Sequence, residues 1–355
     1  MATKKKTADP AKKLLLTAIK KTINHNTVLP ILEDVYFTPT SAIVYDLETH
    51  VKIPFKLDGV PEGGICIPAK MLENVMGMTD TLTVKVTKDF SATFIEGSRE
   101  MKLQGEDPMN YPIEPKGDYK HIGTLEGAQI DDIATALLFV SNDDLRPAMT
   151  GIFFGKDIAA TDAHRMFWKP ITQMEKEFIL PQKAAKILLA LGGKKWEIYH
   201  SESFHVRWIN EVGVEVNTRV IDARFPDYPK VIPSIKEVAG RIISCPSMIM
   251  KEIANAQKFA NRSTNQVKFE MTDKVKIKSE DVDFSFEYSS IIKGAEVHFK
   301  GDKTKEMSIA FNGKFLTQII GLTAEDSPVE IDFWGPTKAA IINKHFLCMP
   351  LMLNS

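Results

Sequence analysis

The octet A-T-D-A-H-R-M-F at 160–167 gathers three side chains that could do chemistry. Asp162 could orient His164 as a general base, while Arg165 could bind an anion. A catalytic site also needs a nucleophile or a cofactor, and no such motif accompanies these residues. We therefore favour Asp162 as a turn residue whose carboxylate binds its own backbone, and we keep a catalytic role as the weaker alternative.

The sequence lacks the short motifs of common cofactor-dependent enzymes. It contains no G-x-x-x-x-G-K-[ST] and no G-x-G-x-x-G, the motifs that bind nucleotide phosphates. The eight histidines are scattered, and their only tight group is His200, Glu202 and His205. They alternate along a strand pattern, which favours a half-exposed strand over a metal site. We expect no metal, no cofactor and no catalytic residue.

Length and composition indicate a multidomain globular protein. A chain of 355 residues exceeds what one hydrophobic core usually serves, and its 44% hydrophobic and 26% charged residues are ordinary. No apolar run reaches the ~20 residues of a membrane helix, and no signal peptide is recognisable. Cys66, Cys245 and Cys348 are odd in number and far apart, which predicts free thiols in the cytoplasm. The net charge of −1 allows one basic surface that is balanced by acidic surfaces elsewhere.

Two kinds of segment recur three times along the chain. A helical pattern followed by a polar loop and a strand occurs at 10–37, 127–154 and 246–271. A short strand followed by an amphipathic helix occurs at 65–78, 178–193 and 307–322. The period of ~115 residues is typical of a domain.

Alternating segments between these helices predict antiparallel strands. They lie at 81–86, 195–200, 205–209, 275–280, 283–288 and 329–334. Each repeat is therefore expected to be an α+β domain with two helices packed on antiparallel sheets. With joints in 111–119 and 232–240, the predicted domains are 1–118, 119–238 and 239–355.

Helix ends carry recognisable signals. Asp9 and Asn312 suit N-caps, and Pro10 suits the first position of a helix. Pro68 and Pro181 are likewise expected in the first helical turn, where no N–H partner is needed.

Basic residues recur on the predicted helices. In the first helix four lysines share one half of the helical wheel and the apolar residues share the other. A solvated lysine face is the ordinary interpretation, but recurrence across the repeats favours a surface that faces phosphates. The helix at 127–139 differs, since it carries Asp131 and Asp132 and no lysine. The residues of this predicted phosphate-facing surface are Lys12, Lys13, Lys20, Lys21, Lys183, Lys186, Lys251 and Arg262.

Four stretches together resemble the bacterial-type DNA sliding clamp, the beta subunit of DNA polymerase III. They are V-L-P-I-L-E-D-V at 28–35, L-R-P-A-M-T-G-I-F-F at 145–154 with A-T-D-A-H-R-M at 160–166, R-F-P-D-Y-P-K-V-I-P at 224–233 and M-P-L-M-L at 349–353. The sequence departs from the family at Ala163, where glycine is usual, and at Asn26, where a basic residue is common. Lys258 and Phe259 replace two apolar residues, and Asn354 and Ser355 extend the usual end. Such departures are typical of a divergent member, for instance one encoded by a phage.

The resemblance implies a closed ring made by a head-to-tail homodimer of three-domain chains. Helices would face an encircled DNA duplex without sequence preference, and the topology would hold the ring on DNA while loose phosphate contacts permit sliding. The implied partners are double-stranded DNA, the replicative polymerase, the clamp loader, other proteins with a clamp-binding motif and a second copy of the chain. The protein would be a non-enzymatic processivity factor in the cytoplasm, associated with the nucleoid, with no membrane partner.

The resemblance also assigns the octet to a hydrophobic cleft that binds short peptide tails of partners. Methionines suit such a cleft because they adapt to several partner sequences. Carried over by position, the cleft residues are Met149, Thr161, Ala163, His164, Arg165, Met166, Pro226, Lys230, Val231, Phe315, Leu347, Met349, Pro350, Leu351 and Met352.

Two alternatives stay open at the level of sequence. One is a structural or interaction repeat protein that forms no ring, which its native mass in solution would reveal. The other is an enzyme that uses Asp162, His164 and Arg165, for which turnover by the purified protein is the test.

Overall fold

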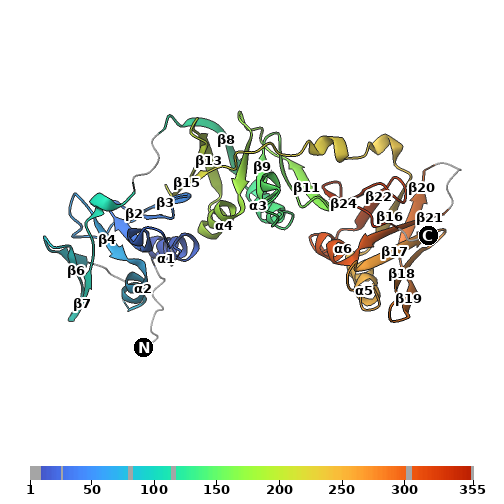
Figure 1. The fold of residues 1–355 in the computed structure, drawn as a ribbon, viewed down its shortest axis with the longest axis horizontal. Coiled ribbons are helices and arrows are strands. Elements are labelled where there is room, and N and C mark those ends of the chain that lie inside the picture. The colour runs from blue at the N-terminus through green and yellow to red at the C-terminus, as the bar shows by residue number, and fades with distance from the viewer. Residues whose placement is uncertain (1–8, 25–26, 79–82, 113–116, 301–305, 353–355) are drawn as a thin grey trace. The chain divides into compact units, whose positions relative to one another are not determined.

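The computed structural model describes residues 9–24, 27–78, 83–112, 117–300 and 306–352 (Figure 1). The chain divides into two compact units. Unit 1 comprises Met1–Leu137, Thr150–Ile158 and Pro170–Ala223, and unit 2 comprises Leu138–Met149, Ala159–Lys169 and Arg224–Ser355. Helices and antiparallel sheets make up both units, so the predicted α+β class is confirmed. The division into three domains stays a prediction.

Each repeated segment contributes the helix expected of it. Unit 1 contains α1 (Pro10–Thr22), α2 (Ala69–Met78), α3 (Ala128–Leu137) and α4 (Gln182–Leu191), and unit 2 contains α5 (Pro246–Gln257) and α6 (Gly313–Ile320). Short 3-10 helices span Pro30–Glu33, Pro108–Asn110, Pro147–Met149, Tyr228–Val231 and Ile235–Glu237. In the described part of the chain, every helix is too short or too polar to cross a bilayer.

The main sheet of unit 1 has eight antiparallel strands in the order β4-β1-β2-β3-β15-β14-β13-β8. They are β1 (Asp34–Phe37), β2 (Ser41–Tyr45), β3 (Thr49–Pro54), β4 (Ile65–Pro68), β8 (Lys120–Glu126), β13 (Lys195–His200), β14 (His205–Asn210) and β15 (Glu215–Arg219). A smaller sheet joins β5 (Thr83–Val86), β6 (Ser91–Glu96) and β7 (Arg99–Gln104), and β9 (Gly151–Phe154) pairs with β12 (Phe178–Pro181). The pairing of β3 with β15 joins two groups of strands that are far apart in sequence into this one sheet.

Unit 2 contains two sheets. One has the order β11-β24-β23-β22-β16-β20 and the other β19-β18-β17-β21. Their strands are β11 (Arg165–Pro170), β16 (Gly240–Ser244), β17 (Gln266–Met271), β18 (Val275–Asp281), β19 (Phe286–Ile291), β20 (Glu296–Phe299), β21 (Met307–Asn312), β22 (Val329–Phe333), β23 (Ala340–Ile342) and β24 (Phe346–Cys348). Strand β10 (Asp157–Thr161) begins in unit 1 and ends in unit 2. Helices α5 and α6 pack on each other and on strands of the second sheet (Figure 1).

Apolar side chains on alternate strand positions build the cores. In unit 1, Trp196 and Trp208 are fully buried with ring centroids 6.5 Å apart. In unit 2, Phe269 and Phe311 play the same part, with centroids 6.3 Å apart in an edge-to-face arrangement. Aromatic pairs of this kind add to the stabilisation from buried area, which fixes the sheets beneath the helices.

Both predicted N-caps, Asp9 and Asn312, are confirmed. Pro68 and Pro181 were expected in the first turn of a helix, but each lies one position before its helix begins. Asp9 Oδ1 accepts a hydrogen bond of 3.0 Å from Ala11 N, and Asn312 Oδ1 accepts one of 3.0 Å from Lys314 N. Pro68 is the last residue of β4 and Pro181 precedes α4 with a φ of −58° and a ψ of 144°. Both prolines end a strand because their fixed φ also suits extended backbone.

The predicted strands fall close to their observed positions, with one displacement. The segment predicted at 283–288 forms a strand at Phe286–Ile291 instead. Ser285 has a φ of 54°, so the chain turns in the left-handed region there, which alternation of side chains does not reveal. The predicted strand at 81–86 is observed from Thr83, and its first two residues lie outside the described part.

A buried carboxylate in unit 1 should make folding pH-dependent. Asp34 is 5% exposed, and its Oδ2 has no hydrogen-bond partner among the described residues. Burial, followed by the nearby Glu106 and Glu33, raises the pKa of Asp34 from 3.8 to about 7. The folded state therefore keeps a proton that the unfolded state releases, so the stability present below pH 4 is lost as the pH rises to about 7.

We expect Asp34→Asn to remove this loss. Between pH 5 and pH 8 the native protein should lose roughly 2–3 kcal/mol of unfolding free energy that the Asn variant retains, since one pKa unit corresponds to about 1.4 kcal/mol. Urea denaturation at four pH values measures the difference. The exposed Asp58 serves as the control, because Asp58→Asn should follow the native curve. Parallel curves for the native protein and Asp34→Asn would show that Asp34 ionises normally.

Candidate functional site

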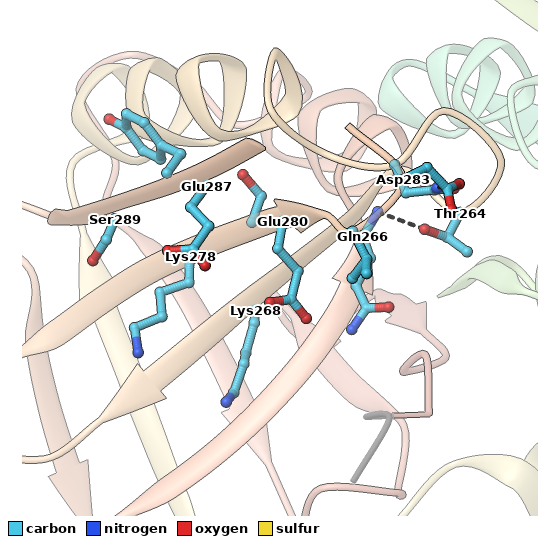
Figure 2. A pocket seen from close by; sticks show the side chains of 12 residues that line it. Thr264, Gln266, Lys268, Lys278, Glu280, Asp283, Glu287 and Ser289 are labelled. Carbon is cyan, nitrogen blue, oxygen red and sulfur yellow. Dashed lines mark hydrogen bonds between the residues drawn. The ribbon is translucent and has the colours of Figure 1, made fainter. Parts of the chain in front are cut away.

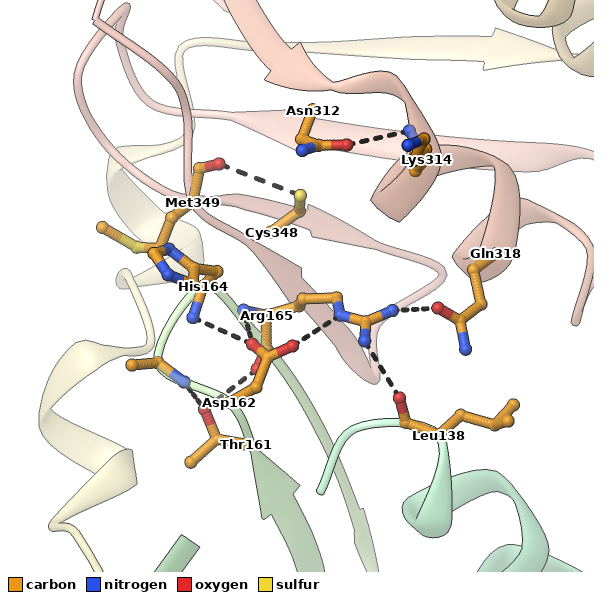
Figure 3. Close-up of polar contacts among 11 residues, drawn as sticks. Leu138, Thr161, Asp162, His164, Arg165, Asn312, Lys314, Gln318, Cys348 and Met349 are labelled. Carbon is orange, nitrogen blue, oxygen red and sulfur yellow. Dashed lines mark hydrogen bonds and ion pairs between the residues drawn. The ribbon is translucent and has the colours of Figure 1, made fainter. Parts of the chain in front are cut away.

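The turn between β10 and β11 uses its aspartate to hold the backbone. Asp162 Oδ1 accepts hydrogen bonds from His164 N at 3.0 Å and Arg165 N at 2.9 Å, and Asp162 Oδ2 accepts one from Arg165 Nε at 2.8 Å (Figure 3). Thr161 Oγ1 accepts a further bond from Ala163 N at 3.1 Å. The Asp162 carboxylate is therefore committed to the turn, as expected of a turn residue.

Ala163 occupies a backbone conformation that favours glycine. Its φ is 74°, where a Cβ atom crowds the following carbonyl oxygen at a cost of roughly 1 kcal/mol. The turn keeps this conformation because its polar groups are satisfied around it.

We expect Ala163→Gly to raise the unfolding free energy by about 0.5–1 kcal/mol, because relief of strain exceeds the added flexibility of the unfolded chain. Thermal unfolding measures the change. Ala190→Gly on the exposed side of α4 is the matched control and should destabilise by about 1 kcal/mol. Equal destabilisation by both substitutions would contradict strain at Ala163.

Arg165 is held by groups from three elements of unit 2. Besides Asp162, its guanidinium donates to Gln318 Oε1 of α6 and, at 3.1 Å, to the carbonyl oxygen of Leu138 (Figure 3). Its Cζ atom lies 5.3 Å from the ring centroid of Phe139 and 4.6 Å from that of Phe315. The side chain is only 11% exposed, so these contacts enclose most of the cation.

The C-terminal segment is joined to the same turn by backbone hydrogen bonds. Strands β11 and β24 pair with Arg165 opposite Cys348. Met349 N then donates to the carbonyl oxygen of His164 at 2.8 Å, and Leu351 N donates to that of Ala310 at 2.7 Å. The segment after β24 therefore lies between the turn and strand β21.

Apolar side chains of the C-terminal segment and of the 3-10 helix Tyr228–Val231 stay open to solvent. Met349 is 41% exposed, Met352 74% and Val231 56%. His164 is exposed as well, and its ring stacks on Phe315 with centroids 6.1 Å apart. Exposed methionines and aromatic rings around a fixed turn form a surface that suits an apolar peptide.

The remaining predicted cleft residues divide into surface and interior positions. Met166 and Leu347 are 2% and 3% exposed and lie opposite each other in β11 and β24. They support the surface from beneath and do not line it, because alternate strand residues point into the core. Lys230 is exposed and pairs with Asp227 at 2.6 Å. The half-buried or buried residues are Met149, Thr161, Pro226, Pro350 and Leu351.

Leu138, Phe139 and Gln318 were not predicted as site residues. Each reaches Arg165 from a distant part of the chain, and Gln318 lies 153 positions after Arg165. Phe139 and Leu138 look like ordinary core residues at the end of a helical pattern. No local signal could have indicated this grouping, because it arises from tertiary packing alone.

Three lysines of the first helix form the exposed basic face that was expected. Lys13, Lys20 and Lys21 are exposed on α1. Lys12 is 9% exposed, so its predicted place on that face is wrong. Lys12 lies three and seven residues before Leu15 and Ile19, which places it on the buried stripe of the helix.

The other predicted basic positions differ in how freely they are exposed. Lys186, Lys251 and Arg262 are exposed. Lys183 is half-buried and forms an ion pair with the carboxylate of Asp46. Its charge is thereby partly neutralised, so Lys183 is the weakest candidate for a phosphate contact.

A polar groove of about 650 Å³ lies on strands β17, β18 and β19 of unit 2 (Figure 2). Lys268 and Lys278 face each other across the two strands, and both pair with Glu270 at 3.0 and 2.9 Å. Glu280 and Glu287 face each other on the next strand pair. Charges of both signs alternate here, so the groove lacks the single charge sign of a phosphate-binding surface.

The histidines considered as metal ligands in the sequence, His200 and His205, lie in strands β13 and β14. His200 is buried in β13, and burial lowers its pKa, with Lys176 adding to the effect. His205 Nδ1 lies 2.8 Å from the carbonyl oxygen of Ser203. Within the described ranges, no three residues among histidines, cysteines, aspartates and glutamates are placed to hold a metal ion.

Comparison with known proteins finds similar chains of nearly the same length. The beta sliding clamp of Staphylococcus epidermidis is 24% identical over 355 residues, covering 91% of this chain and 90% of that protein. The beta sliding clamp of Staphylococcus aureus is 23% identical over 351 residues, with the same coverage. No protein-family profile matches the chain.

The fold is shared with solved structures. The DNA polymerase sliding clamp of Bacillus subtilis has a TM-score of 0.81 at 19% identity, covering 97% of this chain and 98% of that one. The DNA polymerase III beta subunit of Thermotoga maritima has a TM-score of 0.80 at 19% identity, covering 97% of each. A Pseudomonas aeruginosa sliding clamp bound to griselimycin has a TM-score of 0.81 at 18% identity, again covering 97% of each chain.

Proposed function

We propose, from the premise that this chain is a divergent homologue of the bacterial beta sliding clamps, that it is a processivity factor which encircles duplex DNA and tethers a replicative polymerase. The observation that carries the proposal is the extent of the match. The relatives align with 91% of the chain in sequence and 97% in structure. Nearly every segment of a beta clamp therefore has a counterpart here.

The proposed ring consists of two chains, each with domains at 1–118, 119–238 and 239–355. The exposed cations of α1, α4 and α5, together with one in the turn after α5, would face the DNA, namely Lys13, Lys20, Lys21, Lys186, Lys251 and Arg262. Lysines and arginines bind phosphates without reading bases, and each contact is weak and exchanges with salt ions. Weak contacts suit a ring, because its topology prevents dissociation while the contacts allow sliding.

Two exposed sheet edges support head-to-tail self-association. Strand β7 is an edge of the small sheet in unit 1, and β19 is an edge of the second sheet in unit 2. Open edges present unpaired N–H and C=O groups, and pairing unlike edges of two chains can close a cyclic dimer. Phe286 at the start of β19 is 51% exposed, and Phe259 stacks on Tyr288 with centroids 5.5 Å apart.

The surface around His164, Phe315 and the C-terminal segment would bind partner peptides. A partner tail with a glutamine followed by leucine and phenylalanine would bury its apolar side chains against Met349 and Met352. Each apolar side chain so buried contributes about 1.5–3 kcal/mol. Polymerase, clamp loader and other proteins with such a tail would share this surface.

The turn that suggested catalysis is part of this surface in the proposal. Asp162 binds the backbone and side chain of the residues that follow it, so it is not free to orient a base. The protein would act as an accessory subunit of a DNA polymerase in the cytoplasm, at the nucleoid, without a reaction of its own.

Charge reversal on α1 tests the DNA contacts. In a variant with Lys13→Glu, Lys20→Glu and Lys21→Glu, we expect the amount retained on nicked circular DNA to fall about tenfold at low salt. The slope of log retention against log salt should fall by about 0.9 for each phosphate that the variant no longer neutralises. Retention measured by gel filtration between 50 and 200 mM salt provides both values.

The matched control reverses three exposed lysines outside the helices, Lys85, Lys88 and Lys274. This variant has the same net charge change and should be retained like the native protein. If both variants lose retention equally, net charge alone is responsible. If neither does, the lysines of α1 are an ordinary solvated face.

A further inference from the structure

Within unit 2, Arg165 connects the turn at 161–165 with helix α6 and with the turn residues Leu138 and Phe139. We propose that Arg165 is a positioning residue. It holds α6 and the turn residues Leu138 and Phe139, which follow α3, against the turn at 161–165. In this way it fixes the shape of the surface that is proposed to bind partner peptides. This inference rests on the proposed peptide-binding role of that surface. It assigns recognition of the peptide to His164, Phe315 and the C-terminal segment instead of to the guanidinium.

The hydrogen bonds of Arg165 reach parts of the chain that are remote in sequence. Nη1 donates to Gln318 Oε1, 153 residues away, and Nη2 donates to Leu138 O, 27 residues away. Nε donates to Asp162 Oδ2 within the turn. A planar guanidinium has donors in several fixed directions, so it can hold three elements at once.

Aromatic rings complete the enclosure. The guanidinium lies near Phe139, which follows α3, and near Phe315 on α6. Contacts between a cation and an aromatic face gain strength when water is excluded. Both the hydrogen bonds and the ring contacts therefore join the same three elements.

The exposure of the side chains indicates that Arg165 positions other groups and that His164 contacts the peptide directly. The Arg165 side chain is 11% exposed and the Asp162 side chain 17%, so a peptide carboxylate would have to displace Asp162 to reach the cation. His164 is exposed beside it and stacks on Phe315. A bound peptide would meet His164 and the ring of Phe315, whose position depends on Arg165.

The turn that contains Arg165 is also connected to the C-terminal segment. Arg165 pairs with Cys348 across β11 and β24, and Met349 N bonds to His164 O at 2.8 Å. Loss of the guanidinium contacts should therefore loosen α6 and the hydrogen bond of Met349 together. Under the three-domain division these contacts would also join the second domain to the third.

The test combines hydrogen exchange of the free protein with binding of a fluorescein-labelled synthetic peptide that carries glutamine, leucine and phenylalanine. For Arg165→Met and for Gln318→Leu we expect amide exchange in α6 and at Met349 to rise about tenfold or more. Peptide affinity should fall about tenfold in parallel. Gln318→Glu keeps an acceptor for the guanidinium, so its amide exchange and its peptide affinity should both be close to those of the native protein. Ile331→Val, in the core of β22, is a control that lowers stability and should leave affinity unchanged.

The inference is overturned if Arg165→Met weakens peptide binding while exchange in α6 stays unchanged, since that pattern indicates direct contact with the peptide. It is also overturned if Gln318→Leu changes neither quantity. Should Arg165→Met fail to fold, the pair Gln318→Leu and Gln318→Glu still decides. If the native protein does not bind the peptide, the proposed function fails, and exchange in α6 alone decides whether Arg165 holds that helix.

Discussion

Removal of residues 349–355 is expected to abolish binding of a partner peptide, with a loss of affinity of about a hundredfold or more. The truncation removes Met349 and Met352, whose exposed apolar surface would meet the peptide. The bound peptide would bury both side chains, so their loss corresponds to about 3 kcal/mol or more of binding free energy. Fluorescence anisotropy with a peptide carrying glutamine, leucine and phenylalanine measures the affinity.

The truncation also removes two backbone hydrogen bonds, from Met349 N and from Leu351 N. We therefore expect a modest loss of thermal stability, about 1 kcal/mol for each bond, and an unchanged dimer. A shorter truncation of 353–355 leaves all predicted cleft residues in place and should bind the peptide normally. An unfolded truncation, or one that binds with native affinity, would contradict the cleft assignment and make the C-terminal segment a part of the core.

The second large effect is expected at the edge of unit 2. Phe286→Asp should raise the dimer dissociation constant about a hundredfold, because the interface would bury a charge in place of a half-exposed aromatic ring. Sedimentation or light scattering over a range of concentrations measures the change. Loss of the dimer should also abolish retention on circular DNA.

Phe204 provides the matched control for this substitution. It is 47% exposed on the turn between β13 and β14 and belongs to neither edge strand. Phe204→Asp should leave the mass of the native protein unchanged. A native protein that is monomeric at tens of micromolar, or a Phe286→Asp variant that stays dimeric, would contradict pairing through β19.

Local patterns in the sequence predicted the elements because the physics that forms them is local. Strand β13 coincides with the alternating segment K-W-E-I-Y-H, and Asp9 and Asn312 cap the helices that they precede. A cap or an alternating strand depends on residues within a few positions of each other. The same reason explains why the repeated helices were all found.

Long-range contacts account for what the sequence did not reveal. Lys12 shares one half of the helical wheel with the other lysines, but it borders the stripe of Leu15 and Ile19 and is 9% exposed in α1, which packs on α4, β2 and β3. The enclosure of Arg165 by Gln318 and Phe315 depends on how α6 packs against the turn. The raised pKa of Asp34 likewise depends on burial and on Glu106, which no spacing in the sequence shows.

The most direct measurement of the central claim is retention on DNA before and after linearisation. The protein is loaded onto nicked circular DNA with a clamp loader and ATP, and the complex is separated by gel filtration. We predict that it elutes with the circle and is released once a restriction enzyme opens the circle, because a ring slides off a free end. Equal retention on circular and linear DNA would indicate ordinary surface binding and would contradict a ring that encircles the duplex.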